Sequence, residues 1–181
     1  MARPREFDTN IALAAAMQVF WKHGYEGASL PDLLTGMNLT RGSLYKAFKD
    51  KKTLFLLALK TYEDSAVDAA IARLRDDTIS DPWVRLMGLM NTIPETVAAG
   101  DHRGCLLCSA AAGPAFYDGE IATLVHKSLK KMRDAFGEVT GDSALSDLLL
   151  SQYVGLQILS RSNVPAQSLR DSVAALDRLK P

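Results

Sequence analysis

The chain has 181 residues and no net charge, with 48% hydrophobic and 23% charged residues, which is ordinary globular composition. No stretch holds the roughly 18 uninterrupted apolar residues of a membrane span, and the N-terminus lacks the apolar segment of a secretory signal. Only two cysteines are present, Cys105 and Cys108, which excludes a disulfide scaffold and favours a reducing compartment, the cytoplasm.

Charge is unevenly distributed along the chain. Residues 1–60 contain nine lysines and arginines against five acidic residues, a net charge of +4, and the remainder therefore carries −4. A basic front on an acidic body is expected of a polyanion-binding module attached to another part. Because an excess of four charges can arise by chance, it supports DNA binding without establishing it.

Helical signals recur along the sequence, strand signals do not, and about nine helices can be placed. The first expected helix runs from Asp8 or Thr9 to His23, where Gly24 suits a left-handed terminus. Its core-facing stripe, at helical spacing, consists of Leu13, Ala16, Met17 and Phe20.

The second and third expected helices are short and follow each other closely. The second begins at Ser29, a good N-cap, with Asp32 favouring the positive helix end. It ends near Asn38, which tolerates a left-handed backbone, and its inward side would carry Leu30, Leu33 and Leu34. The third begins at Thr40 and ends before Lys49. Two short helices joined by a tight turn describe a helix-turn-helix.

The rest of the chain is expected to form longer helices. Asp50 caps a fourth helix over about 51–75, whose buried side would carry Leu54, Phe55, Ala58, Leu59 and Tyr62. Asp81 and Pro82 open a fifth, kinked at Pro94, and four more follow over about 104–112, 118–138, 142–160 and 165–179. Apolar stripes mark the last two, with Leu145, Leu148, Leu149, Tyr153, Leu156 and Leu159, then Leu169, Val173, Leu176 and Leu179. The sequence thus predicts an all-α protein with a three-helix N-terminal domain (1–50), which contains the helix-turn-helix, and a second helical domain (51–181).

The first turn of the third expected helix carries side chains suited to reading DNA, because a recognition helix meets bases and phosphates with its N-terminal residues. Arg41 can bond a guanine edge or a phosphate, and Gly42 permits close approach. The expected DNA-binding residues are Arg3 and Arg5 in a basic arm, Ser29, Thr40, Arg41, Gly42, Ser43, Tyr45, Lys46 and Lys51, with further cationic contacts from Lys49 and Lys52.

Two stretches resemble TetR-family regulators. Residues 15–25, AAMQVFWKHGY, resemble the family's first helix, and residues 39–54, LTRGSLYKAFKDKKTL, resemble its recognition helix and the start of its fourth helix. The match covers about residues 8–55. Asn38 stands where the family usually has glycine, and Leu34 where a small residue is more usual. Each feature alone also fits ordinary core or solvated lysines, but their common register favours a DNA-binding helix-turn-helix.

The resemblance implies a cytoplasmic transcription repressor, not an enzyme. It implies a homodimer that binds a palindromic operator in double-stranded DNA and is released by a small-molecule inducer. The central helices would bind the ligand, and the last two large helices, whose apolar stripes one chain would leave partly uncovered, would pair with a partner's. The fourth helix would link pocket to DNA-binding domain. An activator stays open, because the sequence does not encode where the operator lies.

Large, adaptable side chains are the candidate pocket residues, although each also fits ordinary core. They are Trp83, Met87, Met90, Phe116, Tyr117 and Tyr153, together with Cys105 and Cys108. The Gly-Cys-Leu run at 104–106 resembles a segment of many TetR-type ligand domains. Three interpretations of the cysteine pair are open: buried small hydrophobes, a thiol switch that forms a disulfide or reacts with an electrophile, or a metal site with His102, for which no fourth ligand is evident. No cofactor or metal is expected.

Proteins of two other classes are the alternatives. An all-helical enzyme or small-molecule carrier would make the N-terminal motif merely structural, but the sequence has no glycine-rich phosphate loop, His-x-x-x-His pair or nucleophile elbow. A DNA-binding architectural protein without a sensor would not need the large apolar second part. No membrane partner is expected.

Overall fold

The computed structural model describes residues 7–180, and this range is helical without a strand. Its helices are α1 (Thr9–Gly27), α2 (Leu30–Met37), α3 (Arg41–Phe48), α4 (Lys51–Tyr62), α5 (Asp68–Leu74), α6 (Pro82–Ala98), α7 (Leu106–Ala112), α8 (Gly119–Thr140), α9 (Ser143–Leu159) and α10 (Ala166–Leu176). A π-helical turn, Glu63–Val67, joins α4 and α5 into one rod, so the described residues form nine helices and the all-α prediction is confirmed.

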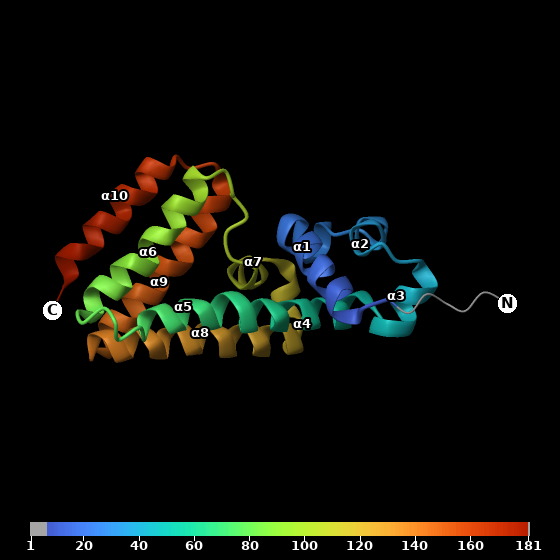
Figure 1. Cartoon of the computed structure of the whole chain (residues 1–181), viewed down its shortest axis with the longest axis horizontal. Coiled ribbons are helices and arrows are strands. Elements are labelled where there is room, and N and C mark those ends of the chain that lie inside the picture. The colour runs from blue at the N-terminus through green and yellow to red at the C-terminus, as the bar shows by residue number, and fades with distance from the viewer. Residues whose placement is uncertain (1–6, 181) are drawn as a thin grey trace.

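The molecule is elongated, with α1–α3 at one end and α6, α9 and α10 at the other (Figure 1). We call residues 9–50 the head and residues 51–180 the body. The α4–α5 rod and α8 run side by side along the molecule, and α4 packs against α1. Across the range described, no helix combines the length and apolar character needed to cross a bilayer.

Capping side chains fix the ends of the head's helices. The Ser29 hydroxyl accepts the Asp32 N–H at 3.2 Å, and the Asp32 carboxylate accepts the Ser29 N–H at 3.0 Å, which completes a capping box. Thr40 caps α3 through the Ser43 N–H, and Asn38 between them is left-handed, with φ 52°. These three predictions from the sequence are confirmed.

The predicted core stripe of α1 is confirmed at Ala16 and Phe20 and wrong at Leu13 and Met17. Ala12, Ala16 and Phe20 are buried, whereas Leu13 and Met17 are only partly buried. The shift arises because α1 packs against both α4 and α2, so its buried stripe lies between the two contacts. In α2, Leu33 is buried as expected, but Leu30 and Leu34 are only partly so. The predicted face of α4 is confirmed, since Leu54, Phe55, Ala58, Leu59 and Tyr62 are all buried.

The last two helices differ in how much of their apolar stripe the chain covers. Leu169, Val173 and Leu176 are buried where α10 packs against α6, whereas Leu179, the last residue of the predicted stripe, lies beyond α10 and is 38% exposed. On α9, by contrast, Leu148 and Leu159 are 41% and 42% exposed. Pro94 lies inside α6, which continues to Ala98. Both predicted stripes are therefore partly uncovered, that of α9 at two leucines and the last one only at its end.

Candidate DNA-reading face and sensor cavity

One side of α3 is anchored in the head and the other is open to solvent. Leu44 and Phe48, one turn apart, are buried. Arg41, Gly42 and Lys46 on the remaining turns are exposed. The helix is therefore held rigidly while its outer side stays free, which a reading helix requires.

The outer side of α3 presents cationic, hydroxyl and aromatic groups together. Tyr45 is 41% exposed, and the Arg41 guanidinium lies 5.7 Å from the centre of its ring. The Thr40 and Ser43 hydroxyls lie 3.0 Å apart at the N-terminus of the helix. A side-chain carbon added at Gly42 would meet nothing within 4 Å, so the helix surface is open there. Ser29, at the start of α2, is also exposed. Arg3 and Arg5 of the predicted basic arm lie outside the described residues.

The two lysines that open α4 have different surroundings. The Lys51 ammonium lies 4.7 Å from the centre of the Tyr25 ring. The Lys52 ammonium lies 2.8 Å from Asp118 and 2.7 Å from Glu120, which precede and open α8. These hydrogen bonds, first that to Asp118, raise the pKa of Lys52. The expectation that Lys52 offers DNA a further cation is therefore corrected, since its charge is neutralised within the chain and ties α4 to α8.

The turn between α3 and α4 has an unusual backbone. Lys49 has φ 66° and ψ −59°, and the Asp50 N–H donates to the Phe48 carbonyl at 2.7 Å. This is a γ-turn of the strained kind. Asp50 then caps α4 by accepting the Thr53 N–H at 2.7 Å, as the sequence predicts.

Trp21 of α1 joins the head to the body, a role that the sequence did not reveal. Its indole N–H donates to the Gly104 carbonyl at 2.8 Å. The Arg103 guanidinium lies 4.1 Å from the centre of its ring, and the Tyr62 ring meets it edge-on at 4.9 Å. In sequence Trp21 was only one of several aromatic residues in the family-like stretch, because its partners lie more than 40 residues away.

A cavity of about 270 Å³ opens beside Trp21, among α1, the α4–α5 rod, α6 and α9. Its lining mixes apolar and hydroxyl-bearing side chains and comprises Trp21, Tyr62, Ala66, Ala69, Ala70, Arg73, Leu89, Thr92, Ile93, Thr96, Val97, Asp101, Gly104, Tyr153, Gln157 and Ser160. The Asp101 carboxylate is held by Arg103, with nitrogen–oxygen distances of 2.9 and 2.6 Å. A concave, largely apolar site with a few polar groups is the usual form of a small-molecule site.

The predicted pocket residues divide between this cavity, a smaller one and the core. Tyr153 lines the large cavity, and Cys105, Cys108 and Tyr153 line a cavity of about 20 Å³ on the other side of Tyr62. The other five line neither of these two cavities: Trp83, Met87 and Met90 pack in α6, Phe116 is half-buried and Tyr117 is 93% exposed. Trp83, for example, donates its indole N–H to Asp177 at 2.8 Å. Size and apolar character do not distinguish a packed side chain from a cavity wall.

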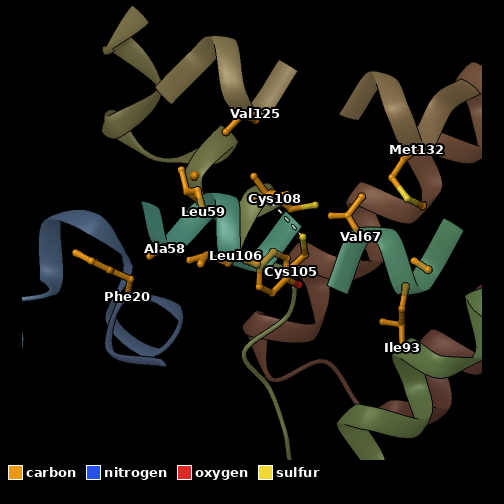
Figure 2. Close-up of a cluster of buried hydrophobic side chains, with 14 of the residues drawn as sticks. Phe20, Ala58, Leu59, Val67, Ile93, Cys105, Leu106, Cys108, Val125 and Met132 are labelled. Carbon is orange, nitrogen blue, oxygen red and sulfur yellow. Dashed lines mark hydrogen bonds between the residues drawn. The ribbon is translucent and has the colours of Figure 1, made fainter. Parts of the chain in front are cut away.

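The two cysteines lie at the N-terminus of α7, in the apolar interior between the rod and α8 (Figure 2). They are 5% and 1% exposed, and the Cys105 sulfur accepts the Cys108 N–H at 3.5 Å. The neighbouring Cys108 side chain lowers the pKa of Cys105 most, burial opposes it, and the Cys108 N–H and the nearby Tyr62 side chain lower it further. The same contact and burial raise the pKa of Cys108. His102 is exposed, and no group of three metal-binding side chains occurs within residues 7–180, so nothing supports the metal alternative.

Comparison with known proteins decides the family. The family model described as bacterial regulatory proteins, tetR family, matches residues 12–58. The uncharacterized HTH-type transcriptional regulator YezE of Bacillus subtilis is 30% identical, over 96% of this chain and 96% of its own length. The chain belongs to the TetR family of transcriptional regulators.

Two further comparisons relate this TetR-family chain to a named repressor and to a regulator solved with operator DNA. The HTH-type transcriptional repressor ComR of Escherichia coli is 44% identical over 62 residues, 34% of this chain and 30% of ComR. A cysteine mutant of the TetR-family regulator CifR, solved with a 26-bp double-strand operator DNA, is 29% identical. The superposition covers 99% of this chain and 100% of that one, with a TM-score of 0.83. The similarity to CifR thus spans head and body alike.

Proposed function

We propose that this TetR-family regulator is a homodimeric repressor that binds a palindromic operator through α3 and leaves it when a small molecule enters the cavity. The observation that carries the proposal is the open side of α3, with Arg41, Gly42 and Tyr45 exposed on a helix anchored by Leu44 and Phe48. Residues 1–50 would read DNA, and residues 51–181 would sense the ligand and dimerise. The regulator would act in the cytoplasm, where bacterial DNA lies.

Both the similar proteins and the exposed apolar side of α9 support this assignment. CifR was solved on operator DNA and ComR is a repressor. The exposed leucines of α9, Leu148 and Leu159, give a two-fold partner an apolar face to cover. Two reading helices related by such an axis match a palindrome with a fixed half-site spacing.

The test is selection of DNA from random genomic fragments by the purified protein, followed by affinity measurement on the enriched sequence. We expect a palindrome, and a dimer at micromolar protein. Arg41→Ala should weaken binding by about 1–3 kcal/mol, as the loss of a base or phosphate contact does. Arg170→Ala is the matched control, because Arg170 is exposed on α10 at the far end of the molecule.

Three results would contradict the proposal in whole or in part. If folded wild-type protein enriches no sequence, the carrier or enzyme alternative is favoured again. If Arg41→Ala and Arg170→Ala bind equally well, α3 is not part of the DNA interface. An enriched palindrome whose occupancy raises transcription in a reporter would make the protein an activator.

A second candidate function, regulation by thiol chemistry, is favoured by the position of Cys105. Its sulfur accepts the Cys108 N–H at the start of α7, and the Cys108 side chain, this N–H and the Tyr62 side chain together lower its pKa and favour the reactive thiolate. Tyr62 also lines the large cavity, so an electrophile bound there would lie one side chain away. The CifR protein that was solved with operator DNA carries cysteine substitutions.

The thiol function is tested with N-ethylmaleimide as the electrophile. The Cys105 thiolate would add to the activated double bond: a carbon–sulfur bond forms, the π electron pair moves to the neighbouring carbon, and that carbon takes up a proton. We expect wild-type protein and Cys108→Ser to lose operator binding on treatment, and Cys105→Ser to keep it. Retained binding by wild-type protein that mass spectrometry shows to be alkylated at Cys105 would contradict the thiol function.

A further inference from the structure

Trp21 is the point where the head enters the wall of the sensor cavity. Among the cavity's lining residues it is the one that comes from residues 9–50, and the others belong to the body. Its indole N–H also holds the carbonyl of Gly104, whose chain neighbour is Cys105. One side chain of the head therefore lines the large cavity and is bonded to the residue next to Cys105.

The loop that Trp21 holds cannot move toward α9. Gly104 has φ +61°, and a side-chain carbon added there would lie 2.3 Å from the Gln157 carbonyl oxygen and 2.8 Å from the Ser160 hydroxyl. The loop is thus pressed against the end of α9, and close-packed interiors transmit displacement rather than absorb it. A molecule in the cavity, or an adduct on Cys105, that displaces Gly104 therefore cannot move it toward α9, and the displacement disturbs the bond between Gly104 and Trp21.

The same loop contacts α1 at further points. The Arg103 guanidinium covers the face of the Trp21 indole and donates to Gln18 at 2.6 Å. Another nitrogen of the same guanidinium donates to the Asp101 carboxylate. Arg161 donates to the Trp21 carbonyl at 3.2 Å and to the Arg103 carbonyl at 2.5 Å. These contacts join one turn of α1 to residues 101–104, so movement of the loop rotates or tilts α1 and, through it, the head.

We propose that Trp21 is the positioning residue that couples the sensor cavity to the DNA-reading face, through its N–H bond to Gly104. The inference rests on the proposed function and specifies its regulation. The bond holds α1 where α3 reads the operator, and a displaced Gly104 releases it. Trp21 itself touches neither bases nor phosphates.

The chain offers a matched pair of variants, because it has two tryptophans. Each indole donates one hydrogen bond at 2.8 Å, Trp21 to Gly104 and Trp83 to Asp177. Trp21→Phe and Trp83→Phe each keep an aromatic ring and remove one N–H, so their losses of folding stability should be similar. We expect Trp21→Phe to bind the selected operator about tenfold more weakly, the scale of one hydrogen bond, and Trp83→Phe to bind as wild type does.

Two readouts separate positioning from a merely structural role. The dependence of operator affinity on salt should have the same slope in Trp21→Phe as in wild type, because no phosphate contact is lost. In Trp83→Phe, where Trp21 is the remaining tryptophan, emission should shift on addition of the operator and not on addition of a random duplex of equal length.

The outcomes for this inference and for the proposed function are distinct. If wild-type protein selects no operator, the proposed function fails first. If wild type binds an operator and Trp21→Phe binds it equally well or better, or if Trp21 emission does not respond to bound operator, Trp21 is not the coupling residue and the regulator transmits its signal elsewhere.

Discussion

The head and the body of this regulator place their functional residues in opposite ways. In the head, Arg41 and Tyr45 are surface side chains of one helix, and the caps Ser29 and Thr40 decide where the helices start. The cavity of the body, by contrast, exists only where the α4–α5 rod, α6 and α9 meet one another and α1 of the head. A site within one element is thus specified locally, whereas a site among four elements depends on their packing. The two regions should therefore respond differently to substitution.

The largest effect is expected where the loop before α7 is pressed against the end of α9. Gly104→Ala adds a carbon 2.3 Å from the Gln157 oxygen at a residue with positive φ, so both a clash and backbone strain arise. We expect it to lose about 3–5 kcal/mol of unfolding free energy in urea titrations. Gly100→Ala is the control: its φ is +90°, but the added carbon meets nothing within 4 Å, so a loss of about 1 kcal/mol is expected. Equal losses would show that the loop is not tightly packed against α9.

The two adjacent lysines at the start of α4 test the comparison of head and body at the boundary between them. Lys51→Ala should weaken operator binding several-fold and reduce the slope of log affinity against log salt by about one, as a lost phosphate contact does. Lys52→Ala should leave that slope unchanged, because Asp118 and Glu120 already neutralise its ammonium. The same change in slope for both variants would mean that Lys52 leaves α8 when DNA binds.

The same division, between features set by nearby residues and features set by helix packing, separates what the sequence predicts from what it does not. The caps Ser29, Thr40 and Asp50 and the left-handed Asn38 were predicted, because each depends on backbone groups within four residues. The rod over 51–74 was predicted from its stripe, but the π-helical turn that joins its halves was not, since no residue pattern marks it.

The cavity was largely missed for the same physical reason. Of the predicted pocket residues, Tyr153 alone lines the larger cavity among those that the structure describes. Large apolar residues such as Trp83 and Met90 were chosen, yet many walls are small residues, such as Ala66 and Ala70, that leave room. A cavity is defined by side chains that are too short to meet, and this depends on helix packing across the chain.

Acid should weaken the body at Glu63, in the π-helical turn. Its carboxylate is buried and lies 2.9 Å from the Lys60 ammonium and 3.3 Å from that of Lys131. Burial alone raises the pKa of Glu63, but the hydrogen bonds from both lysines outweigh it and hold the pKa below its ordinary value of 4.5. The folded state therefore binds this proton less readily than the unfolded chain, and its stabilisation is present above that value and lost as the pH falls below it.

Glu63→Gln tests the sign of this dependence. Unfolding free energy measured from about pH 6 to pH 3 should fall less steeply in Glu63→Gln than in wild type. Glu95→Gln, an exposed position on α6, should follow the wild-type curve. A Glu63→Gln profile parallel to wild type would indicate that the carboxylate gains nothing from its two lysines in the folded state.

The smallest effect is expected at the strained turn between head and body. Lys49 has φ 66° and ψ −59°, a conformation that costs a non-glycine residue about 1–3 kcal/mol. Lys49→Gly removes that strain and loses about 0.5–1 kcal/mol through greater freedom of the unfolded chain, so stability should rise by about 1 kcal/mol. Lys46→Gly makes the same chemical change inside α3, where the backbone is helical, and should lower stability by about 1 kcal/mol. Thermal unfolding of the two variants therefore gives shifts of opposite sign. A lower melting temperature for both would mean that the turn relaxes in solution and that α3 and α4 are joined without strain.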